Sequence, residues 1–218
     1  NPADYILADC MAHDAKTVDA FLESVWTPSL KAAQREAAEL QKLLNKDLPG
    51  EKLQPWDWWY YAEKLRLEKY ALNEEELKPY FELNNVRSGA FGVATKLYGL
   101  QFEQLQDMPV YNEEVEVFKV TYADGSLVGI LYTDYFPRAG KRPGAWMNNI
   151  VSQYVDEEGI DHRPVIINVG NFNKPTQGNP SLLSMDDVET LFHEFGHALH
   201  GLLSKATYKS LAGTNTPR

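Results

Sequence analysis

Apolar residues recur at three- and four-residue steps through the first part of the chain, and this spacing is typical of amphipathic helices. It predicts a helix over residues 3–48 that kinks or restarts at Pro28 and ends at Pro49-Gly50, because proline removes a helical hydrogen bond and glycine readily ends a helix. One face of this helix carries Leu22, Val25, Trp26, Leu30 and Ala33. The first segment is therefore expected to be one long helical stretch.

Two further helices are predicted before the pattern changes. The first starts at Pro55, and the second runs from about Leu77 to Leu100, opened by Asn73 as N-cap and broken at Gly89. The helix from Pro55 is dense in aromatic side chains, namely Trp56, Trp58, Trp59, Tyr60 and Tyr61. Such a cluster forms either a stacking platform for sugars or bases or a packed core. The helical spacing and the acidic charge of the chain favour the core.

Alternation with a period of two then replaces the helical period, which is typical of strands. Residues 115–122 and 127–132 flank Asp124-Gly125 and predict a β-hairpin, because Asp-Gly is a preferred hairpin turn. Residues 163–169 predict a short buried strand beside the hairpin. The whole pattern predicts a mainly α (α+β) fold, with a helical part at 1–106, a small sheet with loops at 107–183 and a last helix at 184–204.

Residues 138–146, between the predicted strands, are rich in turn-forming residues and predict a loop. One interpretation is an ordinary connection. The other is a peptide-binding segment, in which Lys141 and Arg142 attract a peptide carboxylate and the Gly144-Ala145 backbone pairs with an extended peptide. The sequence leaves both interpretations open.

The predicted last helix is amphipathic over its whole length. Ser184 is suited to be its N-cap, and Asp186 and Asp187 place negative charge in the first turn, where the helix dipole favours it. Its apolar stripe consists of Val188, Leu191, Phe192, Phe195, Leu199 and Leu202. One side of this helix is therefore expected to pack against the rest of the chain, while the other side stays free.

The free side carries an H-E-x-x-H motif at residues 193–197. With about 3.6 residues per turn, His193 and His197 project within roughly 40° of each other, so both imidazoles can bind one zinc ion. Glu194 stands beside them, where it can act on a water molecule. The alternative is a plain pair of surface histidines, which the rarity of the motif disfavours. His200 does not occupy the third-histidine position of the longer motif, so we interpret it as a neighbouring or surface group.

A catalytic zinc ion usually has three protein ligands and one water molecule, so the motif needs a further side chain. The sequence contains no Asp or Glu after His197, and Glu189 and Asp186 reach poorly because they lie on the same helix. The chain also opens without methionine and stops at Arg218. We therefore expect a piece of a longer enzyme, incomplete at both ends. Weak or empty zinc occupancy and self-association through uncovered apolar surface would follow.

Residues 193–203 and the ending Ser-Leu-Ala-Gly-Thr-Asn-Thr-Pro-Arg at 210–218 resemble the thimet-oligopeptidase family of zinc metallopeptidases, and within it the bacterial peptidyl-dipeptidases. Upstream stretches agree, at 55–64, 78–86, 98–102 and 178–183. The resemblance implies zinc on His193 and His197, Glu194 as general base, and a third ligand, a glutamate on a following helix, beyond Arg218. It also implies short peptides as substrates, with release of C-terminal dipeptides.

Composition limits the partners and the cellular location that the protein is expected to have. The 218 residues are 44% hydrophobic, enough for a core, and their formal charge of −10 argues against a nucleic-acid surface, because such surfaces gather Lys and Arg. The single cysteine, Cys10, makes no internal disulfide, and no apolar run is long enough to cross a membrane. We expect neither nucleic acid nor membrane as a partner. The expected location is the cytoplasm, with the periplasm as the alternative because the true start of the protein is expected to be missing.

The sequence therefore predicts zinc-dependent hydrolysis of short peptides, with this chain inactive by itself for lack of the third ligand. Two alternatives stay open. One is an endo-acting oligopeptidase, and the other is a non-enzymatic domain with a structural or vestigial metal site. The motif favours an enzyme, because a purely structural site has no use for Glu194 between its histidines.

Overall fold

A computed structural model describes residues 2–71 and 74–216 of the chain. These residues form two compact units, one within residues 2–71 and the other over residues 74–216, which are described separately below. The predicted N-cap Asn73 lies outside the described residues. None of the helices within the two described ranges combines the length and the apolar character needed to cross a bilayer.

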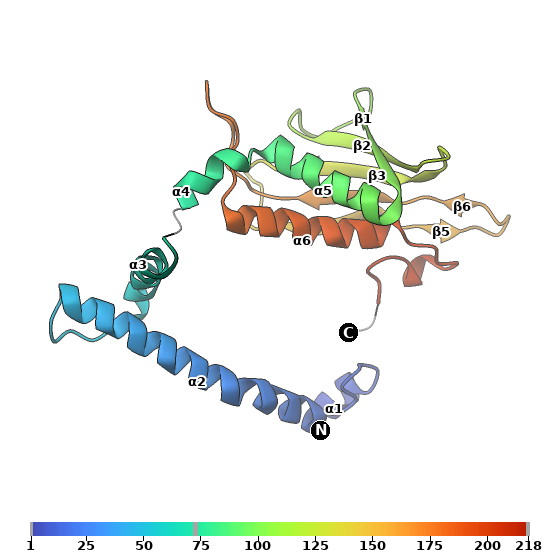
Figure 1. Cartoon of the computed structure of the whole chain (residues 1–218). Helices are drawn as coiled ribbons and strands as arrows, with labels where there is room; N and C mark the ends of the chain where they lie inside the picture. The colour runs from blue at the N-terminus through green and yellow to red at the C-terminus, as the bar shows by residue number, and fades with distance from the viewer. Residues whose placement is uncertain (1, 72–73, 217–218) are drawn as a thin grey trace. The chain divides into compact units, whose positions relative to one another are not determined.

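The first unit consists of helices α1 (Pro2–Leu7), α2 (Ala15–Asp47) and α3 (Trp58–Tyr70), with a 3-10 turn, η1, at Pro55–Asp57 (Figure 1). The prediction of one helix over 3–48 is wrong at residues 8–14, where His13 adopts a φ of 64°. Asp14 then starts α2 by accepting a hydrogen bond from the Thr17 N–H (2.7 Å). Helix α2 continues without a restart through Pro28 and ends, as predicted, just before Pro49-Gly50.

The core of the first unit is small and lies where the end of α2 meets α3. Its buried residues are Leu40, Leu43, Leu44 and Tyr61, with Trp58 partly buried against them. The prediction that the whole aromatic cluster is packed is wrong, because Trp56, Trp59 and Tyr60 are 78%, 81% and 64% exposed. Helical spacing places one side of α3 against α2 and leaves Trp59 and Tyr60 on the rest of its surface, while Trp56 lies in η1 before the helix.

The second unit begins with α4 (Glu74–Leu77), a 3-10 turn, η2 (Lys78–Tyr80), and α5 (Leu83–Tyr98). The predicted break at Gly89 is wrong, because α5 runs through this position and buries the side chains of Val86, Ala90 and Ala94. The break falls instead before Leu83, whose N–H donates to the Ser181 carbonyl (2.9 Å). This hydrogen bond between residues far apart in the sequence takes the place of the bond that Leu83 N–H would make within a continuous helix.

A five-stranded sheet follows, in the order β1-β2-β3-β7-β4. Its strands are β1 (Leu100–Leu105), β2 (Glu116–Tyr122), β3 (Leu127–Asp134), β4 (Trp146–Val151) and β7 (Val165–Val169). The predicted hairpin is confirmed as the antiparallel pair β2–β3, with Gly125 at a φ of 84° in the turn. The predicted third strand is confirmed as β7, which lies parallel to β3.

The two edge strands, β1 and β4, were not predicted. The expected helix end at Leu100 is wrong, because Gly99 adopts a left-handed φ of 70°, ends α5 and turns the chain into β1. Residues 146–151 pair with β7 in the antiparallel direction. Between β4 and β7 in the sequence, β5 (Tyr154–Val155) and β6 (Asp161–His162) pair with each other as a separate antiparallel ribbon.

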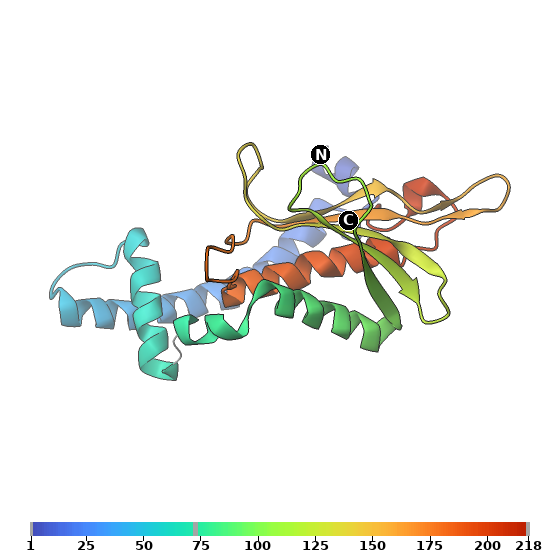
Figure 2. The same ribbon diagram turned by 90° about the horizontal axis from the view of Figure 1, so that it is seen from above.

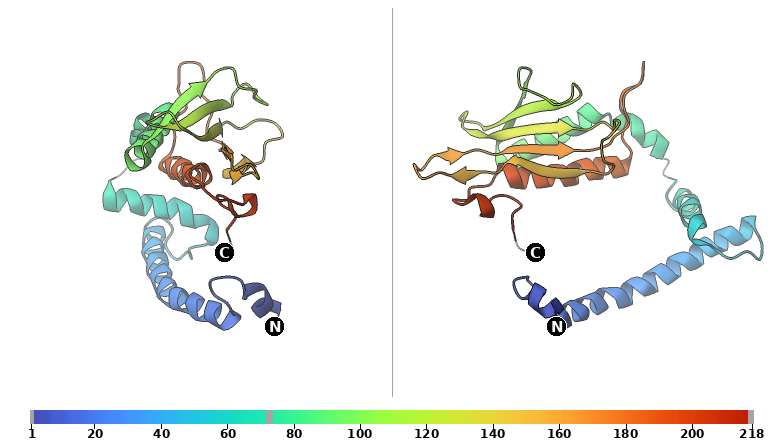
Figure 3. Two further views of the ribbon diagram at one scale, coloured as in Figure 1. Left: turned by 90° about the vertical axis from the view of Figure 1, so that its right-hand side faces the viewer. Right: turned by 180° about the vertical axis from the view of Figure 1, so that it is seen from behind.

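Two layers build the second unit (Figures 1 and 2). Helices α5 and α6 (Met185–Leu202) lie side by side on one face of the sheet, and Figure 3 shows the strands from the opposite side. The main core fills the space between the layers and includes Leu100, Leu131, Ile166, Leu191, Phe195 and Leu202. The last described element is a 3-10 turn, η3 (Lys209–Leu211). The predicted mainly α (α+β) fold is confirmed.

Candidate metal centre

Helix α6 carries the candidate site, and side-chain hydrogen bonds stabilise both of its ends. A capping box closes the N-terminal end, where Ser184 Oγ accepts from the Asp187 N–H (3.1 Å) and Asp187 Oδ2 accepts from the Ser184 N–H (3.0 Å). At the other end, the Arg163 guanidinium donates to the carbonyls of Leu202 (2.7 Å) and Ser204 (3.1 Å). Ser184 is therefore the N-cap, as predicted, and the helix ends at Leu202, two residues before the predicted end at 204.

The packed side of α6 agrees with the predicted stripe, with one exception. Leu191, Phe195 and Leu202 are buried against the sheet, whereas Phe192 is 39% exposed. Phe195, inside the motif, packs against both Phe91 of α5 and Phe102 of β1, at ring-centroid distances of 5.5 and 6.0 Å. Burial of Phe195 therefore places the remaining positions of the motif toward the outside.

The two histidines of the motif meet on this outer side. His193 Nε2 and His197 Nε2 are 3.1 Å apart, the rings are nearly perpendicular, and both side chains are exposed. Zn–N distances of about 2.0–2.1 Å and a tetrahedral angle separate two ligand nitrogen atoms by about 3.3 Å. The spacing of the two nitrogen atoms therefore fits a single zinc ion bound by both imidazoles.

A third ligand does not join the pair within the described part of the chain. No group of three or more His, Cys, Asp or Glu side chains there is placed to hold a metal ion. Glu189 and Asp186, considered above as upstream ligands, are therefore not gathered with His193 and His197. The same holds for His200.

Glu194 lies between the two histidines in sequence and is half-buried. It borders an open hollow of about 380 Å³ on the outer side of α6, together with Asp186, Glu189, Thr190 and His193. Its backbone carbonyl accepts a hydrogen bond from Asn168 Nδ2 of β7 (2.8 Å). The side chain of Glu194 therefore faces accessible space, while its backbone is tied to the sheet.

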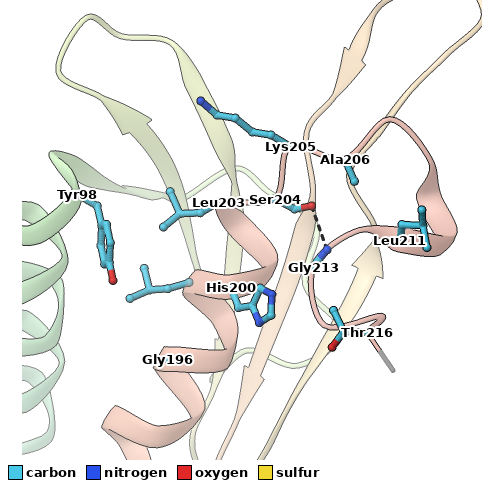
Figure 4. Close-up of a pocket in the computed structure, with 11 residues that line it drawn as sticks. Tyr98, Gly196, His200, Leu203, Ser204, Lys205, Ala206, Leu211, Gly213 and Thr216 are labelled. Carbon is cyan, nitrogen blue, oxygen red and sulfur yellow. Dashed lines mark hydrogen bonds between the residues drawn. The ribbon is translucent and has the colours of Figure 1, made fainter. Parts of the chain in front are cut away.

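His200 lines a different hollow, of about 690 Å³, at the C-terminal end of α6 (Figure 4). Tyr98 of α5 and Leu203 form one side of it, and Gly213 forms another, where its N–H donates to Ser204 Oγ (3.0 Å). The interpretation of His200 as a group beside the metal pair stays a prediction.

The suggested carboxylate-binding role of Lys141 is wrong, because its amine is already used. Lys141 Nζ donates to Asp134 Oδ1 (2.9 Å) and to the carbonyls of Phe136 (2.8 Å) and Gly170 (2.6 Å), and its side chain is 4% exposed. A buried ammonium group that is surrounded by protein acceptors is not available to a ligand.

Lys141 belongs to a cluster of four side chains, the Asp134 cluster, which consists of Tyr111, Asp134, Arg138 and Lys141. Arg138 binds both carboxylate oxygens of Asp134 (2.7 and 2.8 Å), and Tyr111 Oη donates to one of them (2.6 Å). Burial alone would raise the pKa of Asp134, but the hydrogen bonds from Arg138, Tyr111 and Lys141 outweigh it and lower this pKa to about 2. The carboxylate is therefore fully ionised and paired at neutral pH.

The rest of the predicted loop at residues 138–146 is also held in place. Asn171 Nδ2 donates to the carbonyls of Arg142 (3.0 Å) and Gly144 (2.7 Å), and the Arg142 guanidinium lies over the Trp146 ring at 5.0 Å. The loop leads directly into β4, which is an edge of the sheet. Pairing of a peptide with Gly144-Ala145 stays a prediction.

Sequence reasoning missed two features that support the site, namely the Asp134 cluster and Asn168. Asp134 stands two residues after the predicted strand at 127–132 and is followed at four and seven residues by cations, which is a signal that charge pairing could have used. Asn168 stands inside the predicted buried strand at 163–169, where a polar residue needs a partner. The sequence does not reveal that this partner is the backbone of Glu194.

A helix with a paired-histidine motif, packed on a mixed sheet, defines a candidate metallopeptidase site. Comparison with known families identifies the particular family, because the model of peptidase family M3 matches residues 1–218. The chain therefore belongs to peptidase family M3. The resemblance seen in the sequence is confirmed at this level.

Individual relatives agree with the family. The chain is 45% identical to dipeptidyl carboxypeptidase of Salmonella typhimurium, over 100% of this chain and 32% of that protein. It is 43% identical to dipeptidyl carboxypeptidase of Escherichia coli K12, over 99% of this chain and 31% of that protein. It is 36% identical to oligopeptidase A of Salmonella typhimurium, over 98% of this chain and 31% of that protein. The chain thus spans about a third of the length of the relatives it matches.

Proposed function

We propose that the whole protein is a zinc-dependent peptidase in which His193 and His197 hold the metal ion. The observation that carries this proposal is the position of the two Nε2 atoms, 3.1 Å apart on the exposed side of α6, with Glu194 next to them in the sequence. Membership of a peptidase family supports it. Two imidazoles are the donor set that a zinc ion accepts readily, and a catalytic zinc ion needs one more protein ligand. We propose that this ligand comes from a residue outside the chain.

Glu194 is proposed to carry the proton transfers. When bound, zinc polarises the scissile carbonyl and lowers the pKa of a water molecule. Glu194 accepts a proton from the water molecule while the water oxygen attacks the carbonyl carbon of the peptide bond. The same carboxyl group then returns this proton to the nitrogen of the leaving amine as the C–N bond breaks. The half-buried side chain of Glu194, which opens onto the hollow beside His193, suits this exchange.

Short peptides are the proposed substrates, and β4 offers a way to hold them. This strand is an edge of the sheet and packs beside α6, so one row of its backbone groups faces away from β7. An extended peptide that pairs with such an edge becomes an added strand. The segment Gly144-Ala145 immediately precedes β4 and would continue this edge.

Release of C-terminal dipeptides is the proposed product pattern. Two relatives that match the chain over at least 99% of its length are dipeptidyl carboxypeptidases, at 45% and 43% identity. The second candidate is endo-acting cleavage, which the oligopeptidase A relative favours at 36% identity. A non-enzymatic metal domain is a weaker candidate, because it gives no role to Glu194.

The test uses the full-length protein and this chain in parallel, with metal analysis and mass spectrometry of peptide products. The full-length protein is expected to bind one zinc ion, to lose activity with a chelator and to regain it with zinc. This chain alone is expected to bind zinc weakly and to be inactive. Stoichiometric zinc and full activity in this chain alone would contradict the proposed outside ligand.

Substrate design separates the two product patterns. Peptides of increasing length are offered with a free or an amidated C-terminus. Dipeptide release requires recognition of the C-terminal carboxylate, so amidation is expected to abolish cleavage and each free peptide is expected to shorten by two residues at a time. Internal cleavage that tolerates amidation would establish the endo-acting alternative.

A further inference from the structure

One buried side chain joins the sheet to the backbone of the catalytic motif. Asn168 of β7 has no exposed surface, and its Nδ2 donates to the Glu194 carbonyl (2.8 Å). Its Oδ1 accepts a hydrogen bond from the hydroxyl of Tyr135 (3.2 Å). Tyr135 is itself only 4% exposed. A chain of two hydrogen bonds therefore runs from Tyr135, just after β3, through Asn168 to the middle of α6.

The position of this contact along α6 is informative. The carbonyl of Glu194 lies in the helix interior, where it already accepts the regular helical hydrogen bond, so it does not need a second donor for its own sake. Helix ends are the places where orphan carbonyls seek side-chain partners, and Arg163 serves that purpose here. Asn168 instead contacts the backbone of Glu194, the residue that directly follows His193 and carries the proposed base.

Other contacts between α6 and the sheet constrain the helix less sharply. The buried side chains of Leu191, Phe195 and Leu202 hold α6 by apolar contact, which is not directional. A hydrogen bond depends on both distance and angle, so it fixes the slide and the rotation of the helix at the residue it reaches. A small rotation of α6 would redirect the imidazoles of both His193 and His197.

We propose that Asn168, oriented by Tyr135, is a positioning residue for the metal-binding helix. It sets the rotation of α6 on the sheet, so that the two histidines and Glu194 point into the same space. This inference rests on the proposed function, because it assigns Asn168 a role in the zinc-dependent reaction. It also differs from a purely structural role, in which a buried amide merely satisfies its own hydrogen bonds and affects only the free energy of unfolding.

The matched variants remove one link at a time in the full-length protein. Asn168→Leu removes both hydrogen bonds, and Tyr135→Phe removes only the hydroxyl that orients Asn168. Thr133→Val is the control, because Thr133 is the strand partner of Asn168, is 1% exposed, and donates to the Glu116 carbonyl (3.5 Å) rather than to α6. Tyr135→Phe also covers the case in which Asn168→Leu does not fold, since it keeps the ring that fills the core.

Three quantities are measured on each folded variant: zinc affinity by competition with a chelator, kcat and KM separately, and the midpoint of urea unfolding. Asn168→Leu is expected to weaken zinc binding and lower kcat by about 10- to 100-fold, the range for groups that orient metal ligands. Tyr135→Phe is expected to act in the same direction by about 2- to 10-fold, the effect of one hydrogen bond. KM is expected to change little in both, and Thr133→Val is expected to shift only the unfolding midpoint.

The outcomes separate this inference from the proposed function. Wild-type zinc affinity and kcat in folded Asn168→Leu or Tyr135→Phe, with only a lower unfolding midpoint, would overturn the positioning role while leaving the peptidase proposal intact. Equal losses in Thr133→Val would also overturn it, since they would reflect general loosening of the core. A wild-type protein that binds zinc but cleaves no peptide would refute the proposed function, and the zinc affinities would still decide the role of Asn168. A wild-type protein without zinc binding would refute both.

Discussion

The His193–His197 pair and the Asp134 cluster lie in the same unit and use polar side chains in opposite ways. The two histidines are exposed and have each other as their hydrogen-bond partner. The carboxylate of Asp134 is 3% exposed and accepts from Arg138, Lys141 and Tyr111. Groups that still have free coordination capacity can take up a ligand, whereas saturated buried groups can only hold the fold together. The difference shows that the presence of charge alone does not indicate a binding site.

The Asp134 cluster also explains why Lys141 does not bind a carboxylate as its sequence context suggests. A lysine in a glycine- and proline-rich loop resembles a surface cation that awaits an anion. Its amine instead joins the end of β3 to the loop that leads into β4, through Asp134 and the Phe136 and Gly170 carbonyls. The closed cluster therefore shapes the edge of the sheet, while the open pair is proposed to carry out the chemistry.

The largest expected effect comes from the open site. Glu194→Gln in the full-length protein is expected to keep zinc and to lower kcat by about 10²- to 10⁴-fold, because the amide cannot accept the proton of the attacking water. The unfolding midpoint is expected to stay near that of the wild type, since the side chain is only half-buried.

Glu189→Gln is the matched control for this prediction. It makes the same chemical change five residues earlier on α6, on an exposed carboxylate beside the same hollow. Its kcat is expected to stay within about twofold of the wild type, as for a general charge effect at the surface. Similar losses in both variants would show that Glu194 acts through charge and not as the base.

The closed cluster is expected to respond in stability and not in chemistry. Lys141→Met removes the buried ammonium group and leaves its acceptors with one donor fewer, which is expected to cost about 3 kcal/mol in the free energy of unfolding. Lys174→Met removes the exposed partner of Glu114 in the same unit and is expected to cost less than about 1 kcal/mol. Urea unfolding of both variants measures the difference. Equal costs would mean that burial of the Asp134 cluster contributes nothing to its strength.

Acid is expected to open the closed cluster. The pKa of Asp134 lies at about 2 in the folded protein, below the ordinary value of 3.8, so its stabilising effect is complete above about pH 4 and is lost as the pH falls through 2. The loss amounts to at most about 2 kcal/mol. Tyr111→Phe removes one donor and is expected to move this loss to higher pH, whereas Tyr80→Phe, at an exposed position, is not. NMR titration of the Asp134 carboxyl carbon checks the pKa, and a midpoint near 3.8 would contradict it.

The strands that the sequence predicted and the strands that it missed differ in their place in the sheet. The strands β2, β3 and β7 were found, and they are the three inner ones, where apolar residues dominate. The strands β1 and β4 are the edges, and their sequences Leu-Gln-Phe-Glu-Gln-Leu and Trp-Met-Asn-Asn-Ile-Val mix polar residues into the pattern. Edge strands need fewer buried side chains, so the two-residue period is weaker in them.

The helices show the same limit for contacts between distant residues. Periodicity located α6 and the motif side chains correctly, because the apolar stripe and the cap are local. It placed a break at Gly89 instead of before Leu83, where the break depends on Ser181 nearly a hundred residues away. The bond from Asn168 to the Glu194 backbone is of this kind too, so no local pattern could have predicted it.

The smallest expected effect concerns the N-terminal end of α6, which does not contact the open pair. Ser184→Ala removes the hydroxyl that accepts from the Asp187 N–H and is expected to lower the free energy of unfolding by about 1 kcal/mol. Ser184→Asn keeps an accepting oxygen at the cap and is expected to stay within about 0.5 kcal/mol of the wild type. Zinc affinity of the full-length protein is expected to be unchanged in both, because Asn168 and Arg163 hold α6 at its middle and far end. A loss of zinc binding in Ser184→Ala alone would mean that the first turn, and not the sheet, sets the rotation of the helix.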